Sequence, residues 1–463
     1  MNRRAALAAA LLAMLAVPGA KAQQAPLTLG DALERADAGA YANRIAAGEA
    51  RAQVGEGNRA LQGILPTLRV ESGFQRTTDP IGAFGTKLRQ RTISQQDFDP
   101  ALLNHPDAIS NWTGGLVLEQ PLFNMDAWLG RRAASHANEA RASAAAWTSA
   151  ATRVDVVRAY YGAVLASEQV TTLSAALDAA RAHVRQAESM VEQGVVTRSD
   201  GLLARVRAGE VEAALIESQG EAGLAKRQLA TLLGAPGDTS FSLPAQLPPD
   251  ERVAALSFIA PQDETTGAPA PGARADVRAA EAGHAAARAD VKRTQSLWLP
   301  RVNGMARYDW NSPDNVYGGD ENWSVGVVAS WTPFAGASQL AQLQASRGRE
   351  QVARAQAEAA RAQAALDVAQ RENAWRVALE RMRIAGEAVA QSVEAHRIVA
   401  RKYEGGLATV VELLGAQAAE TEARLRHTHA RYEAIVSAAE RLRSAGLDPA
   451  LLAGWALDSR GNR

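Results

Sequence analysis

The sequence predicts an α+β protein in which membrane-type strands alternate with very long helices in two internal repeats. Three observations carry this prediction. Two strand-like stretches, "NWTGGLVLEQPLF" and "NWSVGVVASWTPF", share one pattern, and their Trp and Phe residues recur at the same separation. Two long proline-free segments carry heptad repeats, and the N-terminus reads as an export signal.

Composition excludes several classes of function. The 463 residues have a formal net charge of +0, which gives no electrostatic case for a nucleic-acid partner. The chain has no cysteine, which excludes disulfides, thiolate metal sites, a cysteine nucleophile and a lipid-bearing N-terminal cysteine. Alanine is dense throughout, with Arg, Glu and Gln interspersed, and this composition favours long helices.

Residues 1–22 have the order of a secretory signal peptide. A basic "MNRR" precedes the apolar "AALAAALLAMLAVPG", and Ala20-Lys21-Ala22 is a small-x-small cleavage site. The alternative is an N-terminal membrane anchor, for which the apolar core is short. No later apolar run approaches the roughly 20 residues of a membrane helix. We therefore expect an exported chain that enters a membrane, if at all, through strands.

The second strand-like stretch alternates with period two, as a transmembrane strand does. One face, suited to lipid, carries Trp323, Val325, Val327, Ala329 and Trp331. Ser and Gly occupy much of the other face. The two Trp residues lie about 26 Å apart at about 3.3 Å per residue, close to the height of an apolar membrane band. We expect them at the membrane interfaces.

The first stretch follows the same rule, with Trp112, Leu116 and Leu118 on one face and Thr113 and Glu119 on the other. Trp112 is the third expected interface aromatic. For either stretch alone, a half-buried strand of a soluble sheet remains an equal alternative.

Each stretch has an upstream partner that opens with Leu-Pro, because proline ends a helix and can begin a strand. We expect strands at about 64–75, 111–121, 298–310 and 322–333. The first pair is joined by a long polar loop, about 76–110, and the second by a short turn. Four strands are too few to close a barrel, and open strand edges are not viable in lipid. Several chains must therefore share one barrel.

Long helices are expected at 124–193 and 336–404, with return helices at 197–233 and 408–445. Heptad positions in these segments predict coiled-coil packing; they are Val170, Leu177, Val184 and Val191, then Val368, Trp375, Met382, Val389, His396 and Tyr403. Taken alone, these helices would fit a generic coiled coil.

The two repeats span 23–233 and 273–445. Shorter helices, about 28–61 and 272–296, precede the strand pairs. A Pro- and Gly-rich linker, 234–272, joins the repeats, and 446–463 form a C-terminal tail.

Each long helix ends at a comparable turn. Gly194 corresponds to Gly406, Thr197 to Thr409, and Asp200 to Glu412. Glycine supplies the left-handed stop and threonine caps the next helix.

These features resemble the TolC-like family of outer membrane efflux channels. The resemblance rests on "EQPLF" with "SWTPF", the Leu-Pro strand entries, and the "QGVVTRSD" and "GGLATVVEL" turns, in duplicated order over nearly the whole mature chain. It implies three chains that share a twelve-stranded outer membrane barrel. A periplasmic helical barrel continues it, with the linker and tail in an equatorial belt.

The resemblance also implies partners: a periplasmic adaptor and an inner-membrane pump of the RND, ABC or MFS type, besides outer membrane lipid. The turns would meet the adaptor through Gly194, Val195, Thr197, Gly406, Leu407 and Thr409. The alternative is that these are only tight turns.

The resemblance further implies a gate at the periplasmic entrance. It predicts a hydrogen bond between Asp200 and Tyr403, and a ring of Glu412 side chains around the mouth. The family's further Arg position is Ala408, and its second carboxylate position is Gly415. A surface Asp and a solvated Glu are the alternatives.

No catalytic residue, cofactor or metal site is expected. The seven histidines are scattered, and His396 on the heptad seam is expected to pack rather than to bind a ligand. The alternative function is a non-channel periplasmic coiled-coil adaptor or scaffold, which would need one hairpin flanked by soluble β-rich domains.

Overall fold

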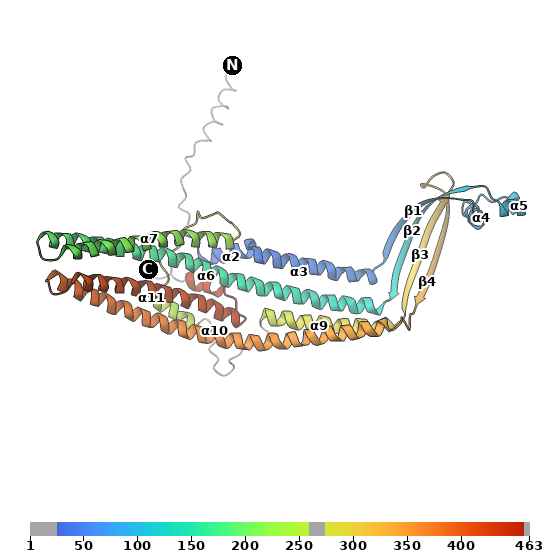
Figure 1. The fold of residues 1–463 in the computed structure, drawn as a ribbon. Helices are drawn as coiled ribbons and strands as arrows, with labels where there is room; N and C mark the ends of the chain where they lie inside the picture. Colours follow the sequence, from blue (N-terminus) through green and yellow to red (C-terminus); the bar gives the residue numbers. More distant parts are fainter. Residues whose placement is uncertain (1–25, 259–273, 458–463) are drawn as a thin grey trace, which may run out of the picture. The chain divides into compact units, whose positions relative to one another are not determined.

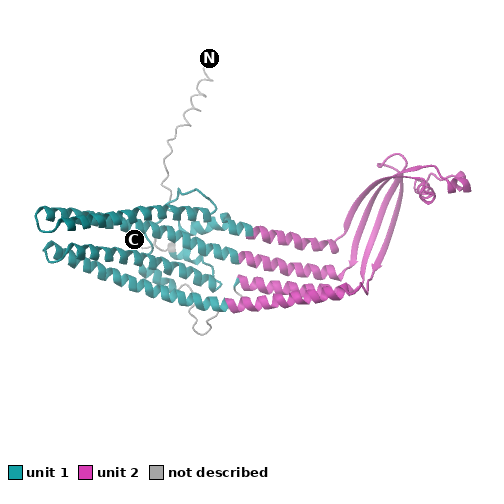
Figure 2. Cartoon of the chain, viewed as in Figure 1, with its two compact units in different colours: residues 1–45, 147–274, 364–463 teal, residues 46–146, 275–363 magenta. Residues whose placement is uncertain are grey.

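The computed structural model describes residues 26–258 and 274–457 (Figure 1). The chain divides into two compact units (Figure 2). The helical unit comprises residues 1–45, 147–274 and 364–463, and the strand-bearing unit comprises 46–146 and 275–363. The expected signal peptide and parts of the expected linker and tail lie outside the described residues.

The strand-bearing unit holds one antiparallel sheet in the order β1-β2-β3-β4. Its strands are β1 (Thr67–Thr77), β2 (Ile109–Phe123), β3 (Arg301–Ser312) and β4 (Asp320–Ser330). The central pairing joins the two repeats, since β2 lies against β3. β1 and β4 are the edges of the sheet in a single chain.

The register aligns apolar side chains from all four strands in rows on one face. Leu68 pairs with Leu118, which pairs with Ala306, which pairs with Val325. The next row along joins Val70, Leu116, Tyr308 and Trp323 in the same way. The opposite face carries polar side chains, among them Arg69, Glu71, Glu119, Arg307 and Asp309. We call these the apolar face and the polar face of the sheet.

A glycine on the apolar face makes room for an aromatic ring from the next strand. Gly114 pairs with Trp310, and a Cβ at Gly114 would lie 2.3 Å from the Trp310 ring. Nearby, the Phe74 and Trp112 rings pack with their centroids 4.6 Å apart. Aromatic side chains therefore gather at this end of the apolar face.

The first strand-to-strand loop, expected as a long polar loop, contains short helices. They are α4 (Pro80–Arg89), η2 (Gln95–Phe98) and α5 (Pro100–Asn104). Asp79 and Asp99 cap α4 and α5 through backbone N–H groups at 2.6 and 2.8 Å, and Pro follows each cap. Asp-Pro at both positions was a helix-start signal in the sequence.

The helices are α2 (Leu29–Gly39), α3 (Tyr41–Arg59), η1 (Ala60–Gly63), α6 (Met125–Glu192), α7 (Arg198–Leu232), α8 (Asp250–Ala255), η3 (Leu256–Phe258), α9 (Ala275–Gln295), η4 (Ser296–Trp298), α10 (Ser338–Glu404), α11 (Val410–Ser444) and α12 (Leu451–Leu457). The first leading helix is broken at Ala40, whose ψ of 131° is not helical. Next to this break Gly39 lies against the Leu233 carbonyl, where a Cβ would come within 2.4 Å. This close approach separates α2 from α3.

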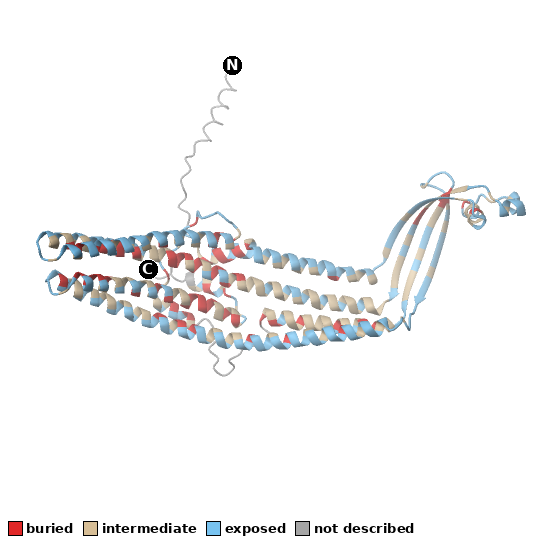
Figure 3. Ribbon diagram, in the orientation of Figure 1, coloured by how far each residue is buried: buried red, intermediate tan, exposed pale blue. Residues whose placement is uncertain are grey.

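The core lies in the helical unit, whereas the edge strands β1 and β4 are mostly exposed and the central strands β2 and β3 are mainly half-buried (Figure 3). Val156, Val157 and Val164 of α6 pack in one cluster with Trp375 and Met382 of α10 and with residues of α2, α7 and α11. The heptad residues Leu177, Trp375, Met382 and Tyr403 are only 1–5% exposed. Among the described helices, none is both long and apolar enough to span a membrane.

The linker and the tail, where described, contact each other in the helical unit. Trp455 Nε1 donates to the Arg252 carbonyl at 3.1 Å, and the Arg252 guanidinium donates back to the Trp455 carbonyl. The guanidinium also lies over the Trp455 ring, 5.4 Å from its centroid.

Candidate functional site

The two helical hairpins end in turns of the same geometry. Gly194 (φ 73°) and Gly406 (φ 72°) have the left-handed backbone that suits glycine. Val195 N donates to Met190 O at 2.9 Å, and Leu407 N donates to Lys402 O at 2.8 Å. These are the six-to-one hydrogen bonds of a Schellman motif.

The apolar residue after each glycine is exposed. Val195 is 57% and Leu407 82% exposed. A Schellman motif often packs this residue back on its own helix. Here both side chains stand in solvent at the hairpin tips, where they are free to contact another surface.

Both return helices begin with a capping box. The Asp200 carboxylate accepts from Thr197 N at 2.9 Å and from Thr197 Oγ1 at 2.7 Å. The Glu412 carboxylate accepts from Thr409 N at 2.7 Å and from Thr409 Oγ1 at 3.0 Å. Each carboxylate therefore satisfies a backbone donor at the start of its own helix.

The structure brings the two hairpin ends together around Tyr403. Its ring is 1% exposed and packs in a cluster with Ala187, Ala204, Leu413 and neighbouring apolar residues. Burial, and then the nearby Asp200 charge, raise the pKa of the Tyr403 phenol. Asp200 is thus close enough to Tyr403 to act on its phenol electrostatically.

The predicted Asp200–Tyr403 hydrogen bond is not formed in this chain. The Tyr403 hydroxyl is buried and has no hydrogen-bond partner among the described residues. In this chain the Asp200 carboxylate accepts instead from Thr197 N and Thr197 Oγ1, both through Oδ2.

Glu412 is an exposed carboxylate at the start of α11. The backbone N–H of Thr409, then its hydroxyl, lower the pKa of Glu412. Glu412 is therefore ionised at neutral pH and oriented by its own helix terminus.

His396 contacts a histidine of the other hairpin, which sequence reasoning did not foresee. The His183 and His396 rings lie 5.9 Å apart, edge to face, and His396 Nδ1 hydrogen-bonds Glu420 Oε2 at 2.7 Å. Burial, and then the His396 charge, lower the pKa of His183. No spacing within one helix could have shown a pair made across α6 and α10.

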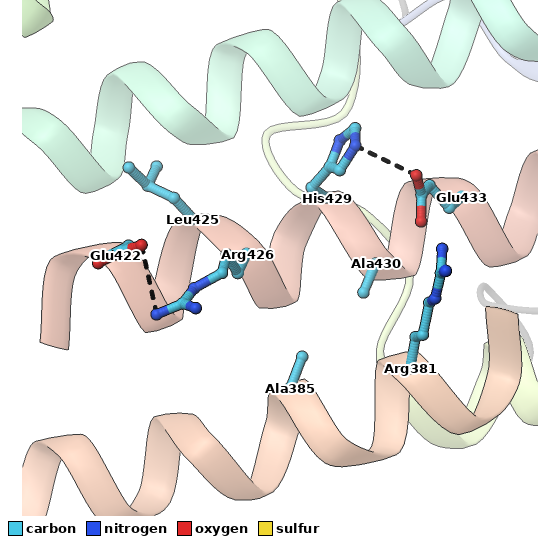
Figure 4. Close-up of a pocket in the computed structure, with 8 residues that line it drawn as sticks. All are labelled: Arg381, Ala385, Glu422, Leu425, Arg426, His429, Ala430 and Glu433. Carbon is cyan, nitrogen blue, oxygen red and sulfur yellow. Dashed lines mark ion pairs between the residues drawn. The ribbon is translucent and has the colours of Figure 1, made fainter. Parts of the chain in front are cut away.

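An open groove lies between α10 and α11 (Figure 4). The α11 side chains form ion pairs along their own helix, Arg426 with Glu422 at 3.4 Å and His429 with Glu433 at 3.3 Å. Arg381 and Ala385 line it from α10. Within the described residues, no three His, Asp or Glu side chains form a group that could hold a metal ion.

The expected interface aromatics differ in position. Trp112 and Trp323 lie in strands on the apolar face, and Trp323 is 76% exposed. Trp331 lies one residue beyond the end of β4, not within the expected strand 322–333, and donates from Nε1 to the Trp298 carbonyl at 3.0 Å. β4 stops here because its partner β3 begins only at Arg301.

A four-stranded sheet with one apolar face, attached to two long helical hairpins with matching tips, is the architecture of outer membrane efflux channels. The chain belongs to the Outer membrane efflux protein family, whose profile matches residues 35–235 and 270–446. No curated protein sequence matches the chain.

Several solved structures share the fold. The outer membrane protein VceC of Vibrio cholerae is 20% identical with a TM-score of 0.73, over 90% of this chain and 96% of that one. The MtrE outer membrane channel of Neisseria gonorrhoeae, in its open state, is 18% identical with a TM-score of 0.73, over 92% and 90%. The CmeC outer membrane channel of Campylobacter jejuni is 14% identical with a TM-score of 0.75, over 93% and 90%.

Proposed function

We propose that three copies of this chain form one export channel of a tripartite efflux or secretion system. The apolar face of the sheet meets outer membrane lipid, and the polar face lines the passage. The helices extend the passage into the periplasm, where it receives substrates from an inner-membrane pump through an adaptor. The chain acts as a conduit and not as an enzyme.

The observation that carries the proposal is the sheet, with its register-aligned apolar face and its two unpaired edges. Leu68, Val70, Val325 and Val327 are each 67–73% exposed in a single chain. Lipid would cover them, and a neighbouring copy would pair the edge strands β1 and β4. Backbone groups left unpaired in lipid cost several kcal/mol each, so closure requires further copies.

The alternative of a periplasmic adaptor fits less well. An adaptor would present one hairpin between soluble β-rich domains, whereas this chain has two hairpins and a sheet whose apolar face is left open by residues 26–258 and 274–457.

Purification from outer membranes in mild detergent tests the proposal. Light scattering and crosslinking are expected to show a trimer that resists heat during electrophoresis, and planar bilayers are expected to show discrete conductance steps. A folded monomer without conductance would refute it.

Within this channel, we propose that the hairpin tips dock the adaptor and that Asp200, Tyr403 and Glu412 form the periplasmic gate. Support comes from the exposed Val195 and Leu407 and from the proximity of Asp200 to Tyr403.

A further inference from the structure

The helix α4 contacts β2, β3 and β4 at the end of the sheet where β1 leads into the first loop (Figure 1). Gln90, the C-cap residue of α4, is 3% exposed, and its Nε2 donates to Asn111 Oδ1 and to the Ser110 carbonyl, both at 2.9 Å. Asn111 pairs with Gln75 and so belongs to the polar face.

The contact continues across the sheet as a chain of buried amides. Asn111 Nδ2 donates to Asn311 Oδ1 at 2.8 Å, and Asn311 Nδ2 donates to Asp309 Oδ2 at 3.2 Å. Asn111 and Asn311 are 4% and 1% exposed. Buried amides that are fully hydrogen-bonded hold one geometry, because breaking one bond leaves another group unsatisfied. α4 is therefore fixed on this face.

A second attachment joins the residue after the helix to β4. Arg91 donates from Nη2 to the Glu321 carbonyl at 3.2 Å, and its Nη1 lies 3.5 Å from Asp320 Oδ1. Arg91 has φ 49°, an uncommon conformation for a residue with a side chain. Such strain persists where the surroundings hold it. α4 is thus anchored to β2 through Gln90 and to β4 through Arg91.

The helix presents an apolar side away from the sheet. Ala83, 1% exposed, and Gln90 lie two turns apart on the packed side. Ile81 and Leu88, also two turns apart, lie on the opposite side and are 85% and 50% exposed. Two apolar side chains therefore project from α4 over the polar face.

The second loop at this end is held on the other face. Trp310, on the apolar face, donates from Nε1 to the Val316 carbonyl at 2.6 Å. Tyr317, next in this turn, is 95% exposed. The first loop is therefore held on the polar face of the sheet and the second on the apolar face. Tyr317, in the second loop, serves as a matched control for the side chains of α4.

We propose that α4 forms an apolar constriction at the outer mouth of the passage, with Ile81 and Leu88 facing the solute. This rests on the proposed channel function, because only there does the polar face line a passage. An apolar constriction hinders hydrated ions, which must shed water, more than apolar or amphiphilic solutes. The substrate class that it favours is accordingly apolar or amphiphilic.

Conductance of purified channels in planar bilayers with potassium chloride tests the proposal. The double variant Ile81→Ser with Leu88→Ser is expected to conduct potassium and chloride better than the parent, and Tyr317→Ser to conduct like the parent. Gln90→Ala, which releases the anchor, is expected to raise conductance and its fluctuation. Heat-resistant trimers of each variant show that assembly is intact.

A second measurement uses the cysteine-free background. A bulky cationic methanethiosulfonate added from the outer side is expected to reduce the conductance of Leu88→Cys and to leave Tyr317→Cys unchanged. Parent-like conductance of the double serine variant, or of modified Leu88→Cys, overturns the constriction. A parent that forms no pores at all refutes the channel instead.

Discussion

At the scale of single residues, the two carboxylates assigned to a gate already have a local task. Asp200 and Glu412 complete capping boxes with Thr197 and Thr409 at equivalent points of the two repeats. Thr-x-x-Asp and Thr-x-x-Glu are a known helix-start spacing, so this role could have been predicted from the sequence. The buried Tyr403 hydroxyl, which has no hydrogen-bond partner among the described residues, could not be predicted, because it depends on the packing of α10 against α7 and not on a local sequence pattern.

Tyr403→Phe keeps the packing of the ring and removes the hydroxyl, so it tests whether the hydroxyl takes part in the proposed gate. An unsatisfied buried hydroxyl contributes no stability, so we expect the variant to unfold at the same temperature as the parent or higher. If the hydroxyl reaches Asp200 in a closed trimer, the variant also leaks more current in planar bilayers. If Tyr403→Phe unfolds at a lower temperature than the parent and leaks no more current, the hydroxyl makes a hydrogen bond that stabilises the assembled protein but does not gate it.

Glu412→Gln tests the charge at the start of α11. The folded-state pKa of Glu412 lies below the ordinary value of 4.5, so its stabilisation is complete above that value and is lost as pH falls through the lowered pKa. We expect the variant to unfold at a lower temperature than the parent at pH 7, with the difference vanishing in acid. Thermal unfolding across pH measures this.

The same variant tests the proposed ring. A trivalent cation added from the periplasmic side is expected to block the parent channel and not Glu412→Gln, because a cluster of three carboxylates attracts multivalent cations. Glu404→Gln removes an equal charge outside the capping box and serves as the control. Equal block of parent and Glu412→Gln would place the side chain away from the passage.

At the scale of elements, alternation was the most informative signal. Period two correctly placed Trp112, Leu116 and Leu118 on one face, and the pairing with β1 and β3 extends that face over four strands. Strand ends were less predictable, because each depends on where the partner begins. The register that sets Trp310 against Gly114 could not be derived either, since it is a property of two strands together.

Gly114→Ala tests that register. The new Cβ would lie 2.3 Å from the Trp310 ring, so the ring must move or the strands must separate. Overpacking of this kind costs about 1–3 kcal/mol, and we expect lower thermal stability and fewer folded trimers. Gly326→Ala, whose nearest contact is 3.8 Å, should behave like the parent. If a smaller residue at Trp310 does not restore the variant, the clash is not the cause.

The hairpin tips are a second test at this scale. Gly406→Trp is expected to abolish efflux while trimers still form, because a bulky side chain would block a close approach by the adaptor. Gly406→Asn is the control for backbone strain, since Asn tolerates the left-handed conformation. Drug susceptibility of cells carrying each variant measures efflux. Equal loss in both variants would point to strain rather than docking.

At the scale of the whole molecule, helix α7 has an apolar stripe that none of the described residues covers. Leu202, Val206, Ile216 and Leu224 are 52–65% exposed. Of the ten heptad positions, Leu177, Trp375, Met382 and Tyr403 are buried within the chain and the other six are half-buried. Heptads could not predict the contact of His183 with His396, because that depends on the relative register of two hairpins.

Ile216→Glu tests whether neighbouring copies cover this stripe. A charge buried at an interface is costly, so we expect the trimer to dissociate at lower temperature or lower detergent concentration than the parent. Gln219→Glu introduces the same charge at an exposed α7 position about 100° around the helix from the middle of the stripe, and should leave assembly intact. Native mass spectrometry gives the oligomeric state. An unaltered trimer in Ile216→Glu would leave the stripe facing solvent.

The unpaired edges of the sheet have a genetic consequence. If β1 of one copy closes against β4 of the next, a barrel of three copies has three such seams, and one defective edge opens it. The fraction of intact channels then equals the cube of the fraction of undamaged chains, because all three chains of a trimer must be undamaged. An allele damaged only in β1 or β4 should therefore be dominant when expressed beside the normal gene, whereas an allele that makes no chain should be recessive.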